Sequence, residues 1–449
     1  MKILILGGGP AGYEAALVAA ELGAEVTVID RAGLGGACVL WDCVPSKTLC
    51  TAAESITWLE QGEALGVKAG APAVDYAALG ARIMSLAEAQ SRDVERRVAS
   101  SGVKIVHEVG RFVDPHTIEA GGDRYEADAI LIATGSSPRE LDTAPPDGVR
   151  ILNGRQVYDL DSVPERLVVV GSGATGVEFA HAFNRLGSQV TLVSSREHVL
   201  PHEDVDAAVV LEEVFTRRGM TIMKGARAAG AMASGDGVIV ALTDGTAVRG
   251  SHALFTVGQV PNSAGLGLED IGVKIANGGG IRIDGVSRTN VGHVYAAGDV
   301  IGGMMLASVA AMQGRIAMWH ALGQAVAPLR SDEVSSTVFT DPEIATAGIS
   351  APEAEKRGMA VDVMKLPLAT NARAKMLGLN DGFVKLLATP GSGTIVGGTV
   401  VAPHASDLIL PISLAVHARL GVAQLAQAFS IYPSLSGSIQ EAARRLMGR

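Results

Sequence analysis

The sequence predicts an α/β protein in which two parallel-sheet domains of the same design are followed by a C-terminal α+β domain. Three observations lead to this prediction. A strand, a glycine-rich turn, a helix and a second strand open the chain, and the same succession returns near residue 166. Beyond residue 331 the pattern changes to strand-like segments followed by two helical runs. At roughly 150 residues per domain, 449 residues correspond to about three domains.

The first succession has the pattern of a βαβ unit. An apolar strand at 2–6 leads into Gly7-Gly8-Gly9-Pro10-Ala11-Gly12, and a helical run at 13–22 leads to a strand at 25–29 that ends in Asp30. The glycines allow a tight turn and let the backbone approach a pyrophosphate at the helix N-terminus. A carboxylate after the second strand can accept the hydroxyls of an adenosine ribose. We therefore expect a Rossmann-like domain with a bound dinucleotide.

The second succession repeats this order. A strand at 166–170 leads into Gly171-Ser172-Gly173-Ala174-Thr175-Gly176, a helix that carries Glu178, and a strand at 189–193. Two such units predict two dinucleotides, which indicates one bound flavin and one passing nicotinamide. The alternative is that one unit has lost its ligand, and the complete context of both units disfavours it.

The two units differ after the second strand. Ser194 and then Ser195 and Arg196 stand where the first unit has Asp30. No carboxylate is placed there to repel a 2′-phosphate, and Arg196 can attract one. The alternative for Arg196 is a plain solvated side chain. We expect NADPH to be accepted, with NADH as an open alternative.

Two further strands end in small and polar residues. A strand at 125–132 is followed by Ala133-Thr134-Gly135, and a strand from Val294 is followed by Gly298-Asp299. Proline-rich text near residue 146 and a change of pattern near residue 330 mark domain boundaries. The predicted division is 1–146 and 266–330 for the first dinucleotide domain, 147–265 for the second, and 331–449 for a C-terminal interface domain. In the last, strands are expected at 383–387 and 394–401 and helices at 405–419 and 422–430.

Composition excludes several classes of protein. The chain has 37 Lys+Arg against 47 Asp+Glu, and the formal charge of −10 argues against a general nucleic-acid surface. Only 3 Cys argue against a disulfide-rich secreted fold and indicate a reducing compartment. The most apolar stretches, 302–319 and 408–426, are interrupted by polar and charged residues. We expect a cytoplasmic protein without a membrane span or a resident metal ion.

The most informative stretch is Gly35-Gly-Ala-Cys-Val-Leu-Trp-Asp-Cys-Val-Pro-Ser-Lys47. Cys38 and Cys43 are five residues apart and can approach each other near the start of a helix. The helix N-terminus and the nearby Lys47 would stabilise a thiolate. Two buried free thiols are the alternative, and Cys50 is expected to be a spare thiol of that kind.

With this stretch the sequence resembles the flavoprotein disulfide reductases, the family of dihydrolipoamide dehydrogenase and glutathione reductase. The resemblance spans essentially the whole chain, through GGGPAG, GGACVLWDCVPSK, ATGSSP, GSGATGVE, GQVPN, YAAGD, FTDPEIATAG and APHASD. It implies FAD along the first unit and NAD(P)H as co-substrate at the second. It also implies a homodimer whose C-terminal domain forms the interface and completes the partner's site.

The resemblance assigns residues to each site. The catalytic set would be Cys38 and Cys43, Lys47 beside the flavin N5, Glu178 paired with Lys47, and Tyr432 in place of the family's histidine. The FAD contacts would be Gly7, Gly9, Pro10, Ala11, Gly12, Asp30, Arg31, Gly36, Ala37, Lys47, Ala133, Thr134, Gly135, Gly298, Asp299, Leu306 and Ala307. The NAD(P)H contacts would be Gly171, Gly173, Ala174, Thr175, Gly176, Glu178, Ser194, Arg196 and Gly258.

The departures from the family pattern concern its usual reaction. Leu40 and Asp42 replace an Asn and a Gly of the cysteine loop. Near the C-terminus, where the family has His-Pro-Thr-Leu-Ser-Glu, this chain has Tyr432-Pro-Ser-Leu-Ser-Gly437. Exchange between dithiol and disulfide needs a base with a pKa near 7, and the side chain of tyrosine ordinarily titrates near 10. A positioned base is worth roughly 10²–10⁴-fold in rate, and glycine cannot orient one.

Three functions follow from these residues. The leading hypothesis is a homodimeric FAD enzyme that transfers hydride from NAD(P)H to flavin and electrons to a quinone, since reduced flavin itself carries the electrons. The C-terminal residues resemble the NAD(P)H:quinone reductase branch of the family. The alternative is a dihydrolipoamide dehydrogenase that uses Cys38 and Cys43 with another base, for which His404 and His417 are candidates. A lesser alternative is a flavin-binding redox sensor without turnover.

Overall fold

The computed structural model describes residues 1–68, 70 and 72–448. The chain forms two compact units, each built from segments that are distant in sequence. The first unit comprises 1–46, 80–139 and 258–329, and the second comprises 47–79, 140–257 and 330–449.

A five-stranded parallel sheet forms the centre of the first unit. The strand order is β18-β7-β1-β2-β3, with Leu4 of β1 opposite Thr27 of β2. All apolar residues of β1 are buried, which is typical of a parallel strand covered on both faces. The strands are β1 (Lys2–Leu6), β2 (Glu25–Ile29), β3 (Lys104–Val106), β7 (Ala129–Ile132) and β18 (Val294–Ala296).

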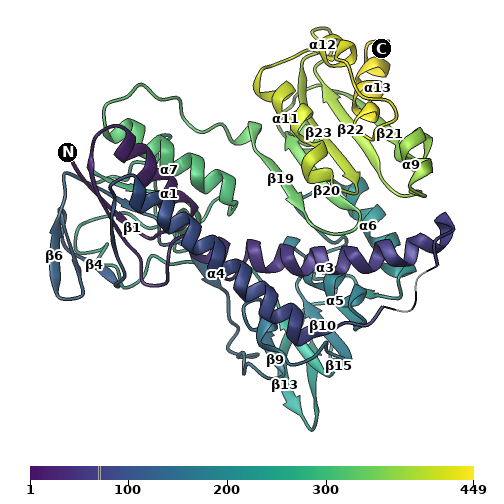
Figure 1. Ribbon diagram of the computed structural model, residues 1–449, viewed down its shortest axis with the longest axis horizontal. Helices are drawn as coiled ribbons and strands as arrows, with labels where there is room; N and C mark the ends of the chain where they lie inside the picture. The colour runs from purple at the N-terminus through teal and green to yellow at the C-terminus, as the bar shows by residue number, and fades with distance from the viewer. Residues whose placement is uncertain (69, 71, 449) are drawn as a thin grey trace. The chain divides into compact units, whose positions relative to one another are not determined.

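Helices α1 (Pro10–Glu21) and α7 (Ala307–Ala321) run side by side on one face of this sheet (Figure 1). Small side chains allow the approach, because a Cβ at Gly314 of α7 would lie 2.1 Å from the carbonyl oxygen of Ala11. Ile3 and Ile5 of β1 pack towards these helices. Leu4 and Leu6 belong to the core cluster of the opposite face, as the two-residue period of a strand requires.

Smaller elements complete the first unit. An antiparallel sheet, β4-β5-β6, and a two-stranded ribbon, β8-β17, lie outside the main sheet. The expected strand at 125–132 is wrong, because the chain leaves the small sheet at Glu126 and enters the main sheet at Ala129. The bounds are α2 (Gly36–Leu40), α4 (Tyr76–Ser100, continuing from the second unit), β4 (Gly110–Asp114), β5 (Thr117–Ala120), β6 (Asp123–Glu126), β8 (Ser136–Pro138) and β17 (Gln259–Pro261).

The second unit contains a parallel sheet of the same design as the first. Its order is β12-β11-β10-β16-β9, and Val168 of β10 lies opposite Thr191 of β11. The apolar run of β10 has the same burial pattern as that of β1. The elements are β9 (Ile151–Asn153), β10 (Arg166–Val170), α5 (Ala174–Arg185), β11 (Gln189–Val193), α6 (Val205–Arg217), β12 (Thr221–Met223), β13 (Ala228–Ser234), β14 (Gly237–Leu242), β15 (Ala247–Gly250) and β16 (His252–Phe255).

The C-terminal part of this unit is an antiparallel sheet with helices packed on it (Figure 1). The strand order is β19-β20-β23-β22-β21, and α13 packs on β21 and β22. Its elements are β19 (Ser335–Val338), β20 (Glu343–Gly348), α8 (Ala351–Lys356), β21 (Asp362–Pro367), α9 (Ala372–Met376), β22 (Phe383–Ala388), β23 (Ile395–Ala402), α10 (Ala405–Leu408), α11 (Leu410–His417), α12 (Val422–Gln427) and α13 (Gly437–Leu446). Helix α3 (Cys43–Gly62) starts in the first unit and continues into the second.

The C-terminal helices are shorter than expected. The run at 405–419 is two helices, α10 and α11, separated at Ile409, with Pro411 in the first turn of the second. Proline is accommodated at that position because the first amides of a helix have no intrahelical partner. The run at 422–430 ends at Gln427 because Ala428 leaves helical geometry.

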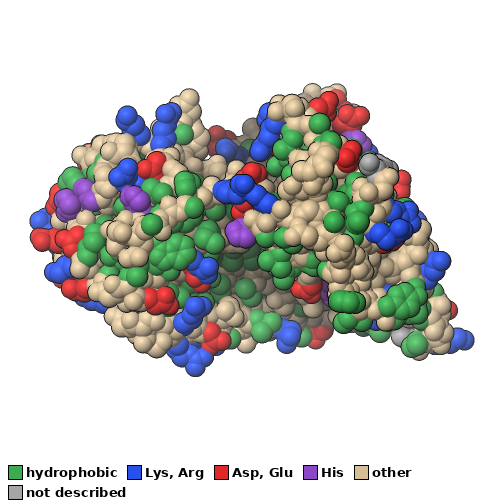
Figure 2. All heavy atoms as spheres, turned by 90° about the horizontal axis from the view of Figure 1, so that it is seen from above, with side chains coloured by type: hydrophobic (Ala, Val, Ile, Leu, Met, Phe, Trp, Pro, Cys, Tyr) green, Lys and Arg blue, Asp and Glu red, His purple; other side chains and the backbone are tan. Residues whose placement is uncertain are grey.

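Two further observations concern the described part of the chain as a whole. None of its helices has the length and apolar character needed to cross a bilayer. On the face seen in Figure 2, acidic and basic side chains are interspersed, and no continuous field of Lys and Arg covers it.

Candidate active site

The two glycine-rich turns have nearly the same geometry. Gly7 and Gly171 have φ of +108° and +111°, a region that disfavours side chains. A Cβ on Gly7 would lie 2.2 Å from the carbonyl oxygen of Ala133, and one on Gly171 would lie 2.4 Å from that of Thr256. The first glycine of each turn is therefore required for the chain to pass its neighbouring strand.

The middle glycine of each turn faces open space. A Cβ on Gly9 or Gly173 would meet no atom within 4 Å, and both residues are the N-caps of their helices. Neither helix has a side-chain cap. The first amides of α1 and α5 thus lie beside an uncrowded glycine, as a bound pyrophosphate requires. Both turns fit a dinucleotide.

The residue after the second strand differs between the units in what it binds. Asp30 accepts hydrogen bonds from the amides of Gly8 at 2.6 Å and Ala32 at 2.8 Å. Ser194 is fully buried, and its hydroxyl lies 2.7 Å from that of Ser172. Each residue therefore braces its own glycine turn, but only the first unit does so with a charge.

Arg196 lies two residues after this buried serine and is exposed. Its carbonyl accepts the amide of Gly225 at 3.0 Å, and its own amide lies 3.2 Å from the Ser194 hydroxyl. The backbone is therefore held while the guanidinium extends into solvent, where it can meet an anion. Arg31, which follows Asp30, is exposed in the same way.

The strand ends of the first unit bring other predicted residues together. The Thr134 hydroxyl donates to the carbonyl of Asn262 at 2.8 Å, and the Ser136 hydroxyl donates to Asp299 at 2.8 Å. Burial raises the pKa of the Asp299 carboxyl, against the effect of that hydrogen bond. Gly298, with φ of +78°, precedes Asp299 in the turn after β18. A partly desolvated carboxylate therefore lies beside the end of this parallel sheet.

The cysteine segment is anchored to the first glycine turn. Gly35 donates to the carbonyl of Gly8 at 2.8 Å, and a Cβ on Gly36 would lie 2.7 Å from the Cα of Gly9. Cys38 lies in the short helix α2, and Cys43 is the first residue of α3. Both are half-buried.

Lys47 and Glu178 meet although 131 residues separate them in sequence. The Lys47 Nζ lies 2.7 Å from Glu178 Oε2, and the carboxylate is 5% exposed. Glu178 Oε1 accepts the backbone amide of Phe339 at 2.9 Å. The ring of Phe339 lies under the ammonium group, 4.9 Å from Nζ to the ring centroid. Both carboxylate oxygens are therefore engaged, and the lysine has contacts with a charge and with a ring.

Phe339 was missed by the sequence analysis. It lies in the segment FTDPEIATAG, which was read as a mark of the family without a role for its first residue. A residue that acts through its backbone amide and its ring face carries no polar side chain to attract attention. The signal in the sequence was the position of Phe339 as the first residue of a segment that resembles the family.

Cys50 is the spare thiol that the sequence predicted. It is 8% exposed, and burial, with the nearby Glu178 charge, raises the pKa of its thiol far above the ordinary value. Such a thiol stays protonated and is a poor nucleophile.

The structure does not bring the C-terminal residues to the Lys47–Glu178 pair. Tyr432 is 84% exposed, between Ile431 and the cis-linked Pro433. Gly437 begins α13. The two candidate histidines each contact a carboxylate: His404 lies 3.3 Å from Glu54, and His417 lies 2.9 Å from Glu333.

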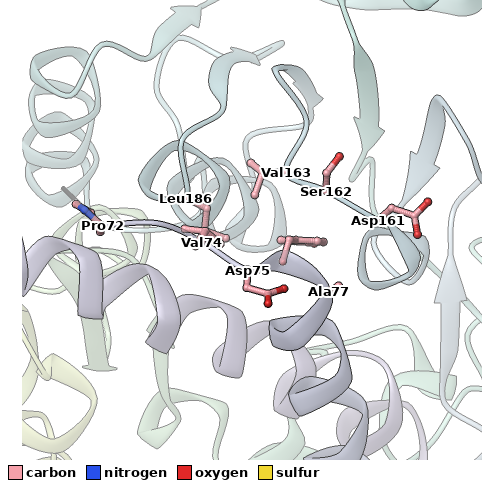
Figure 3. Close-up of a pocket in the computed structure, with 9 residues that line it drawn as sticks. Pro72, Val74, Asp75, Ala77, Asp161, Ser162, Val163 and Leu186 are labelled. Carbon is pink, nitrogen blue, oxygen red and sulfur yellow. The ribbon is translucent and has the colours of Figure 1, made fainter. Parts of the chain in front are cut away.

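A hollow of about 410 Å³ lies elsewhere, beside the start of α4 (Figure 3). Its lining comes from the segment before α4, from the 161–163 segment and from Leu186. Among the described residues that line it, none was predicted for a site, and the charged ones are Asp75 and Asp161. We do not assign the activity to it.

Comparison with known proteins places these features in a family. The model of the pyridine nucleotide-disulphide oxidoreductases matches residues 1–314, and the model of the family's dimerisation domain matches 334–443. Members of the family use FAD with NAD(P)H and form homodimers.

The chain also resembles individual proteins over its full length. It is 51% identical to an NAD(P)H dehydrogenase (quinone) of Mycobacterium tuberculosis, over 99% of this chain and 94% of that protein. It is 34% identical to a dihydrolipoyl dehydrogenase of Geobacillus stearothermophilus, over 100% and 96%. The crystal structure of LpdA from M. tuberculosis superposes with a TM-score of 0.96 at 51% identity, covering all of both chains. The chain belongs to the pyridine nucleotide-disulphide oxidoreductase family.

Proposed function

We propose that this chain is a cytoplasmic, homodimeric FAD enzyme that takes hydride from NAD(P)H and passes electrons to a quinone. One observation carries the proposal. The Lys47–Glu178 pair is formed, whereas Tyr432 and Gly437 occupy the positions of the family's dithiol base and its orienting carboxylate. The machinery for hydride transfer is thus retained and that for dithiol exchange is not. The 51% identity to an NAD(P)H dehydrogenase (quinone) supports the same acceptor class.

The first unit would hold FAD, which accepts hydride from a nicotinamide and passes electrons on when bound. The amides of α1 beside Gly9 would receive the pyrophosphate, and Asp30 with Arg31 would lie at the adenosine end. Asp299 and the Ala133-Thr134-Gly135 turn would line the other end. Gly36 and Ala37, from the start of α2, and Leu306 and Ala307, from the start of α7, would close the remaining sides.

The second unit would bind the nicotinamide nucleotide. Gly173 and the first amides of α5 would receive its pyrophosphate, and Gly258 would lie at the strand-end side. Arg196 would attract a 2′-phosphate, because the neighbouring Ser194 adds no negative charge. We therefore infer that NADPH is accepted at least as well as NADH.

Lys47 and Glu178 would order the reacting region. Glu178 holds the ammonium of Lys47, which would lie beside the flavin N5. A fixed positive charge there would favour the arrival of negative charge on the flavin. Tyr432, exposed in a single chain, would reach the partner's site in the homodimer and line its acceptor side.

The dihydrolipoamide dehydrogenase alternative has one observation in its favour, the retained Cys38 and Cys43. The replacement of the family's His and Glu by Tyr432 and Gly437 argues against it, because the base and its orienting group are both missing at their positions. The sensor alternative is disfavoured by the formed Lys47–Glu178 pair. We also propose that the domain boundaries lie near residues 146, 265 and 330.

Steady-state assays decide between these functions. NADH and NADPH are each tested against lipoamide, glutathione disulfide and naphthoquinones, with and without Cys38→Ser. We expect naphthoquinone reduction to dominate and to survive the substitution. Efficient lipoamide turnover with negligible naphthoquinone reduction would contradict the proposal. A Tyr432→His, Gly437→Glu double variant that gained lipoamide activity by about 10²-fold or more would support it, because it would show that the base is what the chain lacks.

A further inference from the structure

The Lys47–Glu178 pair is held by a third residue, Phe339. Its amide donates to one carboxylate oxygen of Glu178 at 2.9 Å, and the other oxygen takes the ammonium at 2.7 Å. The face of its ring lies 4.9 Å from the same ammonium. One residue thus contacts both members of the pair, by two chemically different groups.

The ring of Phe339 helps to fix the direction of the Lys47 ammonium, which a single ion pair leaves free to rotate. A lysine ammonium sits on a flexible four-carbon stem and can rotate about one carboxylate contact. Attraction of the cation to the ring quadrupole adds a second point of contact in a different direction. The ring also covers part of a side chain that remains 31% exposed, so it limits access of water to the pair.

The segment that carries Phe339 is firmly held. Val338, the preceding residue, is the end of β19 and pairs with Ile344. Asp341 is bound twice by Arg218, at 2.7 Å through its carbonyl and at 2.5 Å through its carboxylate. Thr340 is buried and donates to Pro342 at 2.7 Å. The ring and amide of Phe339 are therefore presented from a fixed platform.

We propose that Phe339 is a positioning residue for flavin reduction. It fixes the direction of the Lys47 ammonium through its ring and that of the Glu178 carboxylate through its amide. This inference rests on the proposed function, because it assumes that Lys47 acts beside the flavin. Phe339 would thus affect the rate of flavin reduction although its side chain has no acid, base or nucleophile.

The test removes the ring and leaves the amide. In the FAD-loaded dimer, Phe339→Leu should slow bleaching of the flavin by saturating NADPH about two- to tenfold in anaerobic stopped flow. FAD content and the dissociation constant of NADP⁺ should stay unchanged. The midpoint potential of the flavin should fall. Phe339→Tyr, which keeps the ring face, should restore the wild-type rate and potential.

A double-mutant cycle shows whether the effect passes through the lysine. In a Lys47→Met background, Phe339→Leu should change the rate less than about 1.5-fold, because residues that act as a unit are not additive. Tyr125→Leu is the matched control, since it removes a cation–π contact of similar length, 5.0 Å from Lys104, away from the site. It should leave flavin reduction unchanged.

Fluorinated phenylalanines at position 339 cover the case in which Phe339→Leu does not fold. They keep the shape of the ring and weaken its negative face stepwise, so the rate should fall with each added fluorine. A flat series, an additive double mutant, or a tyrosine variant as slow as leucine would overturn the inference. The ratio of the flavin reduction rates of variant and wild type tests the role of Phe339 alone. Wild-type flavin that NADPH fails to bleach would instead overturn the proposed function and this inference with it.

Discussion

The variant Glu178→Gln tests whether the contact of Glu178 with Lys47 affects flavin reduction or only the stability of the fold. The substitution keeps the shape of the side chain and removes its charge. Glu178 accepts the Lys47 ammonium at 2.7 Å and the Phe339 amide at 2.9 Å. Glutamine has one carbonyl oxygen, so it can accept from only one of them, and its NH₂ group would face the other donor. A hydrogen bond to a charged group contributes about 1.5–3 kcal/mol, which corresponds to roughly 10–100-fold if the pair acts in the transition state.

The same unit contains a matched control. Glu212 is a buried glutamate that accepts the Lys224 ammonium and, at 2.9 Å, the amide of Val199. Glu212→Gln therefore breaks the same kind of pair with the same kind of second donor. Both variants should lose a similar free energy of unfolding, about 1.5–3 kcal/mol, in urea denaturation.

Anaerobic stopped flow at saturating NADPH distinguishes the two variants. Glu178→Gln should slow flavin reduction about 10–100-fold, and Glu212→Gln should leave the limiting rate within about twofold of wild type. Flavin reduction in Glu178→Gln at the wild-type rate would refute the reasoning. Equal slowing would show that loss of stability, and not the Lys47 contact, determines the rate.

Three other changes have defined outcomes. Ser194→Asp places a carboxylate where a 2′-phosphate would arrive, and the ratio of kcat/KM for NADPH to that for NADH should fall at least about tenfold in steady-state assays. Lys385→Met leaves the buried Asp204 carboxylate without the ammonium that contacts both of its oxygens at 2.7 Å. Urea denaturation should show that the free energy of unfolding falls by about 3–5 kcal/mol. The control Lys365→Met, at a half-exposed lysine, should lower it by less than about 1 kcal/mol. Burial lowers the pKa of His181 to about 3 in the folded chain, whereas an unfolded histidine titrates near 6.5. Below about pH 6.5 the unfolded chain therefore binds a proton that the folded chain does not bind. Stability should therefore fall by about 2 kcal/mol between pH 7 and 5, and His181→Leu should remove that part of the pH dependence in thermal melts; an unchanged slope would exclude the histidine as its source.

Local constraints explain what the sequence could predict. The two glycine turns were predictable because Gly7 and Gly171 adopt a positive φ, which favours glycine through local backbone sterics alone. The apolar runs of β1 and β10 were predictable because a parallel strand buried on both faces needs no alternation. Both signals are visible in the sequence within a few residues, although the contacts that crowd Gly7 and Gly171 come from Ala133 and Thr256.

Tertiary context explains what the sequence could not predict. The run at 125–132 is apolar enough for one strand, but Ala127 donates to His116 and Asp128 donates to Lys2, so the chain changes sheets there. The role of Phe339 depends on an approach to Glu178 across 161 residues. Such contacts leave no period or spacing in the sequence.

The two βαβ units show how one design is adapted to a resident and a passing ligand. Both turns share the geometry of the first and middle glycines, so both can receive a pyrophosphate. The difference lies in how the turn is braced. Asp30 accepts the amide of Gly8, in the glycine turn, at 2.6 Å, whereas the Ser194 hydroxyl lies 2.7 Å from that of Ser172. The other contacts of both residues are to the segment that follows them: Ala32 and Gly33 at 2.8 and 3.1 Å, and Arg196 at 3.2 Å. Each glycine turn is thus braced by one contact from the residue after the second strand, and only in the first unit is the acceptor a carboxylate, which forms the stronger hydrogen bond. The hydroxyl holds the second turn without charge, so this position adds no carboxylate that would repel the 2′-phosphate of the proposed NADPH.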